Sequence, residues 1–255
     1  MSSYIFRFLV LVMLCSAAAT LAFAQKSQPA PTPTPRRPLA KPAAGSRGFD
    51  QFAQRDASAR LIAAGATRSV GDANDHYSKG EAFYKQGNYE AAVRELREAL
   101  KQSPDSDDSH YVLGLALTEL GQLKEAIEEF KRVIEVGITD DTKILAFYNM
   151  GNTYADLGDY EHAIESYQHA IKLDATLSKP HNNLGLAYAA QGKLNEAAAE
   201  FAEAVRLKPS YAEAHFNLGV AYVQLGKKRD AEEQQQALAT LKPDLAEKLR
   251  ALIEK

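Results

Sequence analysis

The chain has 255 residues, with 30 Lys and Arg against 33 Asp and Glu, which gives a formal net charge of −3 at pH 7. This balance provides no chain-wide attraction for nucleic acid, because nucleic acid is bound mainly by clustered basic groups that neutralise its phosphates. Cys15 is the single cysteine, so a disulfide within one chain is excluded and apolar packing has to hold the fold together.

Residues 1–24 predict a secretory signal peptide. Arg7 provides a positive start, and the apolar run at 8–15 is too short to span a bilayer with ease. Small residues follow and end in the motif AFA at 22–24, a small-x-small cleavage site before Gln25. We therefore expect an exported chain, periplasmic or extracellular, without stable membrane insertion after removal of this segment. An uncleaved membrane anchor is the alternative.

Residues 25–48 alternate proline with small and basic residues, which predicts an extended spacer without a core of its own. The next segment, 49–72, carries an apolar stripe at helical spacing that starts with Phe49 and Phe52. We expect a helix that caps the open end of the following fold, and then a linker. A segment that folds only on a partner is the alternative. Together, residues 25–72 hold eight Lys and Arg against three Asp, a net charge of +5.

Five copies of one pattern follow. Each copy has a first helix with a glycine at a fixed place, a second glycine that ends this helix, and a second helix with an alanine at a fixed place. The first-helix glycines are separated by 34, 37, 34 and 34 residues, and they are Gly80, Gly114, Gly151, Gly185 and Gly219. A period of this length predicts a repeat architecture of helix pairs. The expected units span about 73–106, 107–140, 144–177, 178–211 and 212–245.

The fourth unit is the clearest copy and gives the physical reason for the pattern. Gly185 of its first helix and Ala197 of its second helix lack bulk, so we expect the two helices to cross there at close approach. Tyr188 and Phe201 are expected to fill the space beside this crossing. Gly192, between the helices, is expected in the left-handed conformation in which helices commonly end.

Two places depart from the pattern. Ile138 stands where other units have proline, and three extra residues precede the third unit, so the segment 137–143 predicts a longer turn. In the fifth unit, Lys228 and Gln235 occupy places that are apolar elsewhere, as expected of a terminal repeat that faces water. Residues 244–255 carry a leucine-rich stripe and predict a helix that closes the last repeat. A docking helix for a partner is the alternative.

The combination of small residues, aromatic residues and a late proline in each unit resembles the tetratricopeptide repeat. The resemblance covers about residues 73–245. It implies an all-α fold, a right-handed solenoid of helix-turn-helix repeats with a C-terminal capping helix. It also implies that the first helices line an inner groove, where members of this family commonly hold a peptide or a partner helix.

The residues expected at inward positions form the predicted peptide-binding site: Tyr77, Tyr111, Tyr148, Asn182, Phe216, Asn149, Asn183, Asn217 and Asn152. The triplets that begin at Asn149, Asn183 and Asn217 are similar to the Asn-Leu-Gly ladder in the repeat domain of O-linked N-acetylglucosamine transferases. Only that domain is matched, and the first two units have Ser78 and Val112 instead of asparagine.

Side-chain amides offer both donors and an acceptor, so an asparagine ladder predicts a clamp on the backbone of an extended segment. Tyr148 and Phe216, beside the amides, would select apolar or proline-containing side chains. The inner face has no expected cluster of Lys or Arg, so a clamp for a terminal carboxylate is not predicted. The alternative is that asparagine is merely tolerated on a half-exposed helix face.

No residue pattern points to catalysis, a cofactor or a metal site. Four of the six histidines share the fourth place of their unit, where we expect them to fill the core between helices: His76, His110, His181 and His215. His162 and His169 lie seven residues apart with Glu165 between them, which is a thin basis for metal binding. Glycine-rich phosphate loops and nucleophile elbows are missing from the sequence.

These observations favour a non-catalytic scaffold that binds a protein or peptide. Residues 73–255 hold 21 Lys and Arg against 30 Asp and Glu, a net charge of −9, which again disfavours a nucleic-acid partner. The alternative hypothesis is an envelope-assembly or structural accessory protein that acts by self-association and would form homo-oligomers.

Overall fold

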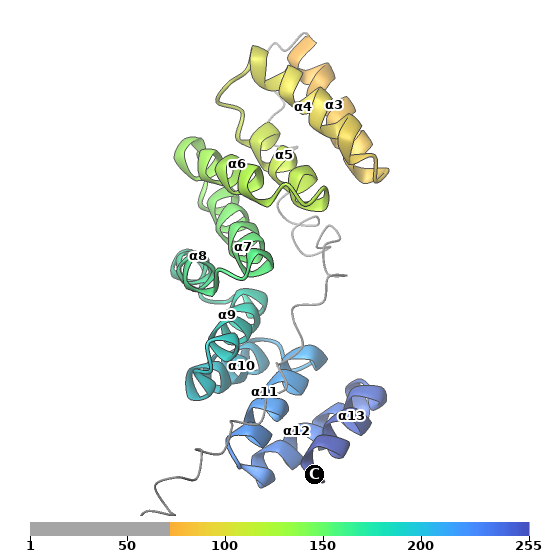
Figure 1. The fold of residues 1–255 in the computed structure, drawn as a ribbon, viewed down its shortest axis with the longest axis vertical. Coiled ribbons are helices and arrows are strands. Elements are labelled where there is room, and N and C mark those ends of the chain that lie inside the picture. Colours follow the sequence, from red (N-terminus) through yellow and green to blue (C-terminus); the bar gives the residue numbers. More distant parts are fainter. Residues whose placement is uncertain (1–71, 255) are drawn as a thin grey trace, which may run out of the picture. The chain divides into compact units, whose positions relative to one another are not determined.

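The computed structural model describes residues 72–254, and this part of the chain is built from α-helices joined by short connections. Eleven helices lie in this range, labelled as in Figure 1: α3 (Asp72–Lys85), α4 (Tyr89–Gln102), α5 (Asp107–Glu119), α6 (Leu123–Val136), α7 (Asp140–Leu157), α8 (Tyr160–Leu173), α9 (Ser178–Ala190), α10 (Leu194–Leu207), α11 (Ala212–Gln224), α12 (Lys228–Leu241) and α13 (Pro243–Ile253). The all-α fold class expected from the sequence is confirmed.

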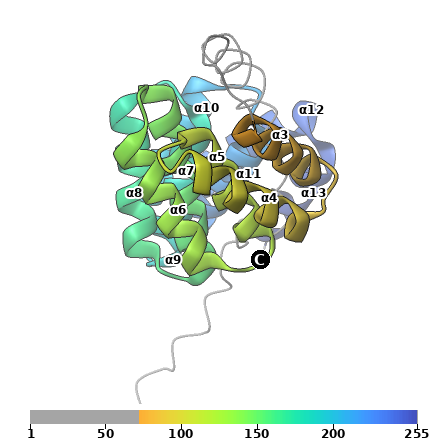
Figure 2. The same cartoon turned by 90° about the horizontal axis from the view of Figure 1, so that it is seen from above.

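The helices pack in chain order as hairpin pairs, from α3 with α4 to α11 with α12 (Figures 1 and 2). Each pair also packs against the next one. The first helices of consecutive pairs contact each other directly, α3 with α5 and so on to α11 with α13, whereas the second helices of the described pairs do not. The first helices therefore form the tighter row of a stack of repeats.

Each first helix ends at a glycine in the left-handed conformation. In the fourth unit, the backbone N–H of Gly192 donates to the carbonyl of Ala189, and that of Lys193 donates to the carbonyl of Tyr188. This arrangement satisfies the last carbonyls of the helix and requires a positive φ, which is 75° at Gly192. The other four units repeat this turn at their own glycines, as the sequence pattern predicts.

The helix crossing predicted at Gly185 is confirmed. A side-chain carbon added at this glycine would lie 2.6 Å from the ring of Phe201 and 3.1 Å from the carbonyl oxygen of Ala197. Phe201 and Ala197 are fully buried. Glycine at this place therefore lets an aromatic ring of α10 lie directly on the backbone of α9.

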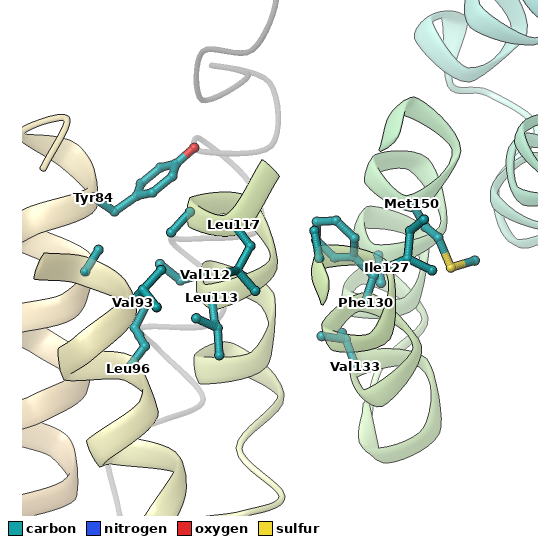
Figure 3. Close-up of a cluster of buried hydrophobic side chains, with 14 residues drawn as sticks. Tyr84, Val93, Leu96, Val112, Leu113, Leu117, Ile127, Phe130, Val133 and Met150 are labelled. Carbon is teal, nitrogen blue, oxygen red and sulfur yellow. The ribbon is translucent and has the colours of Figure 1, made fainter. Parts of the chain in front are cut away.

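One apolar cluster runs through the first five described helices, from Tyr84 of α3 to Met150 of α7. Figure 3 shows Val93 and Leu96 of α4 directed toward Leu113 of α5. From α7 onward the core is divided into three further clusters, centred on α7–α9, α9–α11 and α11–α13. The N-terminal helices therefore share one continuous core, and the C-terminal helices do not.

The prediction of a longer turn at 137–143 was wrong, because the connection between α6 and α7 is shorter than the equivalent connections at 103–106, 174–177 and 208–211. Only Gly137 to Thr139 connect the helices, and α7 begins at Asp140, about one turn earlier than the other first helices begin in their units. The side chain of Thr139 accepts a hydrogen bond from the backbone N–H of Thr142 and caps the helix. The three extra residues thus lengthen the first helix of the third unit.

The closing helix α13 completes the core of the fifth unit. Gln235 stands where the fourth unit has Phe201, and it cannot cover the glycine at the crossing, Gly219, with an apolar ring. Leu249 of α13 lies against Gly219 instead and is fully buried. The predicted terminal helix therefore supplies the apolar residue that the second helix of the last repeat lacks.

The predicted signal peptide (1–24), spacer (25–48) and N-terminal cap with its linker (49–72) lie outside the described residues, apart from Asp72 at the start of α3. Within 72–254, none of the helices combines the length and apolar character that crossing a membrane requires.

Candidate binding face

The predicted site residues all lie on the first helices α3, α5, α7, α9 and α11, which contact one another in chain order. At the fifth place of each unit, Tyr77, Tyr111, Tyr148 and Phe216 are half-buried. Asn182 takes this place in the fourth unit and is only 4% exposed. We call the row formed by α3, α5, α7, α9 and α11 the first-helix row. Units one, two, three and five thus each have a partly exposed aromatic residue on this row.

The asparagines at the sixth place join neighbouring repeats. The Nδ2 of Asn149 in α7 donates to the hydroxyl of Tyr111 in α5 at 3.1 Å, and to the carbonyl of Leu145 at 2.9 Å. Both amide hydrogens of Asn149 are therefore used inside the molecule. The first of these bonds ties the third unit to the second.

Asn183 makes the equivalent connection between the fourth and third units. Its Nδ2 donates to the hydroxyl of Tyr148 at 3.3 Å and to Oδ1 of Asn152 at 2.8 Å. The hydroxyl of Tyr167, a ring of α8 that is 1% exposed, donates to the same Oδ1 at 2.8 Å. One amide oxygen thus gathers hydrogen bonds from α8 and α9.

Asn217 and Asn182 continue this network into the fifth unit. The Nδ2 of Asn217 donates to Oδ1 of Asn182 at 2.9 Å, and the Nδ2 of Asn182 donates to Oδ1 of Asn183 at 3.1 Å. Asn217 is 8% exposed, so its bond to Asn182 is made away from water. A continuous chain of side-chain hydrogen bonds therefore runs from α11 through α9 to α7 and α8.

We call these contacts the asparagine joints: in three consecutive repeats, the sixth-place asparagine donates to the fifth-place side chain of the preceding repeat. The sequence places these residues on one row, and the structure brings them together. The amide donors predicted to clamp a peptide already bind the neighbouring repeat, a role that the sequence reasoning missed. The binding role of the nine residues stays a prediction.

The corresponding contact between the first and second units is apolar. Val112 replaces asparagine at the sixth place of the second unit and is 4% exposed, and it belongs to the same apolar cluster against which Tyr77 packs. Ser78, at the sixth place of the first unit, is exposed and has no preceding described repeat to bind. The two units without asparagine thus differ from the others in how they are joined.

Acidic groups of the first two units lie near two aromatic rings of α3, Tyr77 and Tyr84. Burial, with the carboxylates of Asp107 and Glu81 close by, raises the pKa of Asp108 to about 6. Burial and the nearby Asp108 raise the pKa of the Tyr77 hydroxyl, and burial together with Glu119 does the same for Tyr84. These phenols are therefore neutral hydrogen-bonding groups at physiological pH.

The four fourth-place histidines are not simple core filling. In each, Nδ1 lies within hydrogen-bonding distance of a side-chain oxygen on the second helix of the same unit, 19 residues later. The pairs are His76–Glu95 (2.7 Å), His110–Glu129 (2.6 Å), His181–Glu200 (2.7 Å) and His215–Gln234 (2.8 Å). The sequence contained a signal for these pairs, because the third unit has Phe147 in place of histidine and Ser166 in place of the acceptor.

The other two histidines, His162 and His169, each stack on a different aromatic ring. His169 stacks on Phe147 at a centroid distance of 4.8 Å, and His162 stacks on Tyr154 at 5.1 Å while its Nδ1 binds Asp159. Throughout the part of the chain that the structure describes, no group of three His, Cys, Asp or Glu side chains is placed to hold a metal ion.

Three family models match the sequence. A model described as "TPR repeat" matches residues 151–192 and 187–226, and two models described as "Tetratricopeptide repeat" match residues 77–140 and 212–245. Together they cover most of the described helices. No curated protein matches the sequence.

Solved structures of the same fold cover the repeats. MamA 41-end from Desulfovibrio magneticus RS-1 is 22% identical, with a TM-score of 0.63, covering 69% of this chain and 98% of that chain. YrrB, described as a TPR protein with an unusual peptide-binding site, is 23% identical, with a TM-score of 0.59, covering 71% and 92%. PilF of Pseudomonas aeruginosa is 22% identical, with a TM-score of 0.58, covering 67% and 76%.

The repeat spacing, the glycine turns, the stacked helix pairs and the family models agree with one another. The chain belongs to the tetratricopeptide repeat family.

Proposed function

We propose that the chain is a non-catalytic scaffold that binds an extended segment of a partner protein along the first-helix row. The observation that carries this proposal is the set of half-buried rings at one place of the unit, in Tyr77, Tyr111, Tyr148 and Phe216. Aromatic rings of this kind provide large contact area at low cost in conformational entropy, and they are enriched where proteins bind one another.

The asparagine joints support this proposal indirectly. The bond from Asn149 to the hydroxyl of Tyr111 and the bond from Asn183 to Tyr148 fix two of the rings in place before a partner arrives. A ring that is already ordered loses less freedom on binding, which strengthens the interaction. The amides thus act chiefly as positioning groups, and the rings contact the partner.

The character of the row also favours a neutral or basic segment. The α5 helix, DDSHYVLGLALTE, carries three acidic residues and no Lys or Arg, and α7 carries Lys143 as its one basic residue. A row with so few basic groups is poorly suited to a terminal carboxylate or to nucleic acid. YrrB, which has the same fold, is described as having a peptide-binding site, and this agrees with the proposed use of the repeats.

A peptide selection tests the proposal. The full chain would be used to select binding peptides from a displayed random library, and one selected peptide would be titrated calorimetrically against the wild type and Tyr148→Ala. Truncating one contacting aromatic ring is expected to cost about 1–2 kcal/mol, or roughly a tenfold weaker Kd.

Tyr160→Ala is the matched control, because Tyr160 is also half-buried but begins the second helix α8. It is expected to leave the Kd unchanged. Equal affinities of the wild type and the Tyr148 variant, or a loss confined to the Tyr160 variant, would place binding away from the first-helix row.

We also propose that the chain is exported, on the strength of its first 24 residues. A positive start, a short apolar run and the AFA motif at 22–24 are typical of a cleaved secretory signal. N-terminal sequencing of the protein isolated from its host should then begin at Gln25. An intact Met1 on the isolated protein would contradict cleavage at this site.

A further inference from the structure

The histidine of the second unit stands out among the four fourth-place histidines. Nδ1 of His110 lies 2.6 Å from Oε2 of Glu129 on α6, and its Nε2 lies 2.8 Å from the carbonyl oxygen of Pro104 in the α4–α5 connection. The ring is 8% exposed, so water cannot readily replace either partner. His110, which belongs to α5, thus contacts two other parts of the chain: α6 and the α4–α5 connection.

Both partners of His110 can only accept hydrogen bonds. A carboxylate and a backbone carbonyl have no hydrogen to give, and a neutral imidazole has a single N–H. With a neutral ring, one ring nitrogen would therefore point its lone pair at an oxygen lone pair less than 3 Å away. The imidazolium ion donates from both nitrogens and satisfies both contacts.

Two of the equivalent histidines, His215 and His181, do not impose this requirement. His215 faces the carbonyl of Pro209 at 2.9 Å, but its second partner is the amide of Gln234, which can offer either an oxygen or an NH₂ group. His181 faces Glu200, but its buried Nε2 has no partner within the described residues. A neutral ring is compatible with the contacts of His215 and with the single contact of His181.

We propose that His110 is a proton-operated latch of the second repeat. When protonated, it ties α5 to both α6 and the α4–α5 connection, and loss of the proton releases one of the two ties. The latch operates whether or not a partner occupies the first-helix row.

The charged groups around His110 come from α6 and from the α4–α5 connection. Glu129 favours the imidazolium and Arg132 opposes it, but Arg132 is itself paired with Asp105 of the connection at 3.5 Å and with Glu135 at 2.7 Å. Burial lowers the pKa of His110, and the hydrogen bonds to Glu129 and to the Pro104 carbonyl outweigh it, so the pKa is raised overall.

The sign of the effect on stability follows from this direction. Because the folded pKa lies above the unfolded value of 6.5, the latch contributes its full stability below pH 6.5 and loses it as the pH rises through the folded pKa. The contribution of His110 to the stability of the second repeat should therefore be largest under mildly acidic conditions.

Nitrogen-detected NMR of the histidine rings in the full chain tests the latch. Both nitrogens of His110 are expected to carry hydrogen at about pH 6.5, the ordinary pKa of histidine, and its titration midpoint should lie above that value. The urea midpoint of unfolding should fall as the pH rises from about 6 to about 8.5, because the folded state loses a bound proton. A neutral His110 at pH 6.5 would overturn the proposal.

Glu129→Gln is the matched variant, since the natural His215–Gln234 pair shows that the fold accepts glutamine at this place. It should lower the His110 midpoint and remove about half or more of the change in urea midpoint over that pH range. An unchanged His110 midpoint in the variant would overturn the proposal.

Gln234→Glu performs the reverse experiment. It places a carboxylate opposite His215, which already faces a carbonyl, and so builds a second latch in the fifth repeat. This variant should make the urea midpoint more dependent on pH than that of the wild type. An unaltered dependence, in a variant that keeps its helical circular dichroism, would contradict the idea that two acceptors create the latch.

Discussion

The N-terminal and C-terminal repeats of this chain are joined by different forces. From α3 to α7 the helices share one apolar cluster, in which Val112 occupies the joint between the first two units. From α7 to α11 the apolar core is divided, and two of the three asparagine joints run between the units, while the third, from Asn149 to Tyr111, lies beside the N-terminal cluster. Apolar contact is non-directional, whereas a hydrogen bond requires one partner at one angle. We infer that the apolar contact at Val112 makes the first region unfold cooperatively. The asparagine joints fix the position of each repeat relative to the next in the second region.

The largest effect is expected from removing one core ring in each region. Phe130→Ala and Phe201→Ala each delete a fully buried ring and should each lower the free energy of unfolding by about 3–5 kcal/mol. Hydrogen exchange should distinguish them. Phe130→Ala should speed exchange from α3 to α7, because these helices share one cluster, and Phe201→Ala should do so mainly in α9–α11. Equal spread in the two variants would contradict the division of the core.

A somewhat smaller effect is expected at the C-terminal end. Leu249→Ala removes the residue of α13 that covers Gly219 and should cost about 2–5 kcal/mol in the free energy of unfolding. Exchange should rise first in α11–α13. Leu252→Ala is the control, because Leu252 lies on the same helix but is only half-buried, and it should cost less. A smaller loss for Leu249 than for Leu252 would refute the assigned role.

The asparagine joints predict a graded response. Asn217→Ala leaves Oδ1 of Asn182 buried without its donor, so it should cost about 1–3 kcal/mol. Asn149→Ala should cost less, about 0.5–1.5 kcal/mol, because Tyr111 is only half-buried and we expect its hydroxyl to bind water instead. Urea unfolding followed by circular dichroism measures both. A greater loss for Asn149 would show that burial does not set the strength of the joints.

The smallest effect concerns a charge in the N-terminal region. The pKa of Asp108 rises from 3.8 to about 6 on folding, so its ionisation opposes folding increasingly as the pH rises between these values. Asp108→Asn should therefore stabilise the protein by about 1–2 kcal/mol at neutral pH and have little effect near pH 4. Thermal unfolding at both pH values checks this. Destabilisation at neutral pH would mean that the carboxylate has a favourable partner in solution.

Most of the fold could be predicted from the sequence because its signals are periodic and local. Gly185 at the crossing and Gly192 at the turn are such signals, since each depends on the space or backbone angle at one residue. The early start of α7 was missed because the polar run after Thr139 interrupts the apolar pattern. The threonine cap and the acidic residues Asp140 and Asp141 after it are nevertheless ordinary signals of a helix start.

The candidate site was harder to predict. The spacing placed Asn149, Asn183 and Asn217 on one row, but an amide has several hydrogen-bonding atoms, and spacing alone does not say which neighbour they reach. The sequence pattern also did not predict that Leu249 covers Gly219 in the last repeat, where Gln235 occupies the usual aromatic place. Leu249 comes from a helix outside the repeat pattern. Both features depend on side chains that meet only after the helices have packed.

A double-mutant cycle on Asn182 and Asn217 tests the asparagine joints most directly. Unfolding free energies would be measured for the wild type, Asn182→Ala, Asn217→Ala and the double variant. The pair Asn149 and Asn217, which share no partner, would serve as the control. We expect a coupling energy of about 1 kcal/mol for the bonded pair and additive effects for the control. Additive effects for Asn182 and Asn217 as well would contradict the joints.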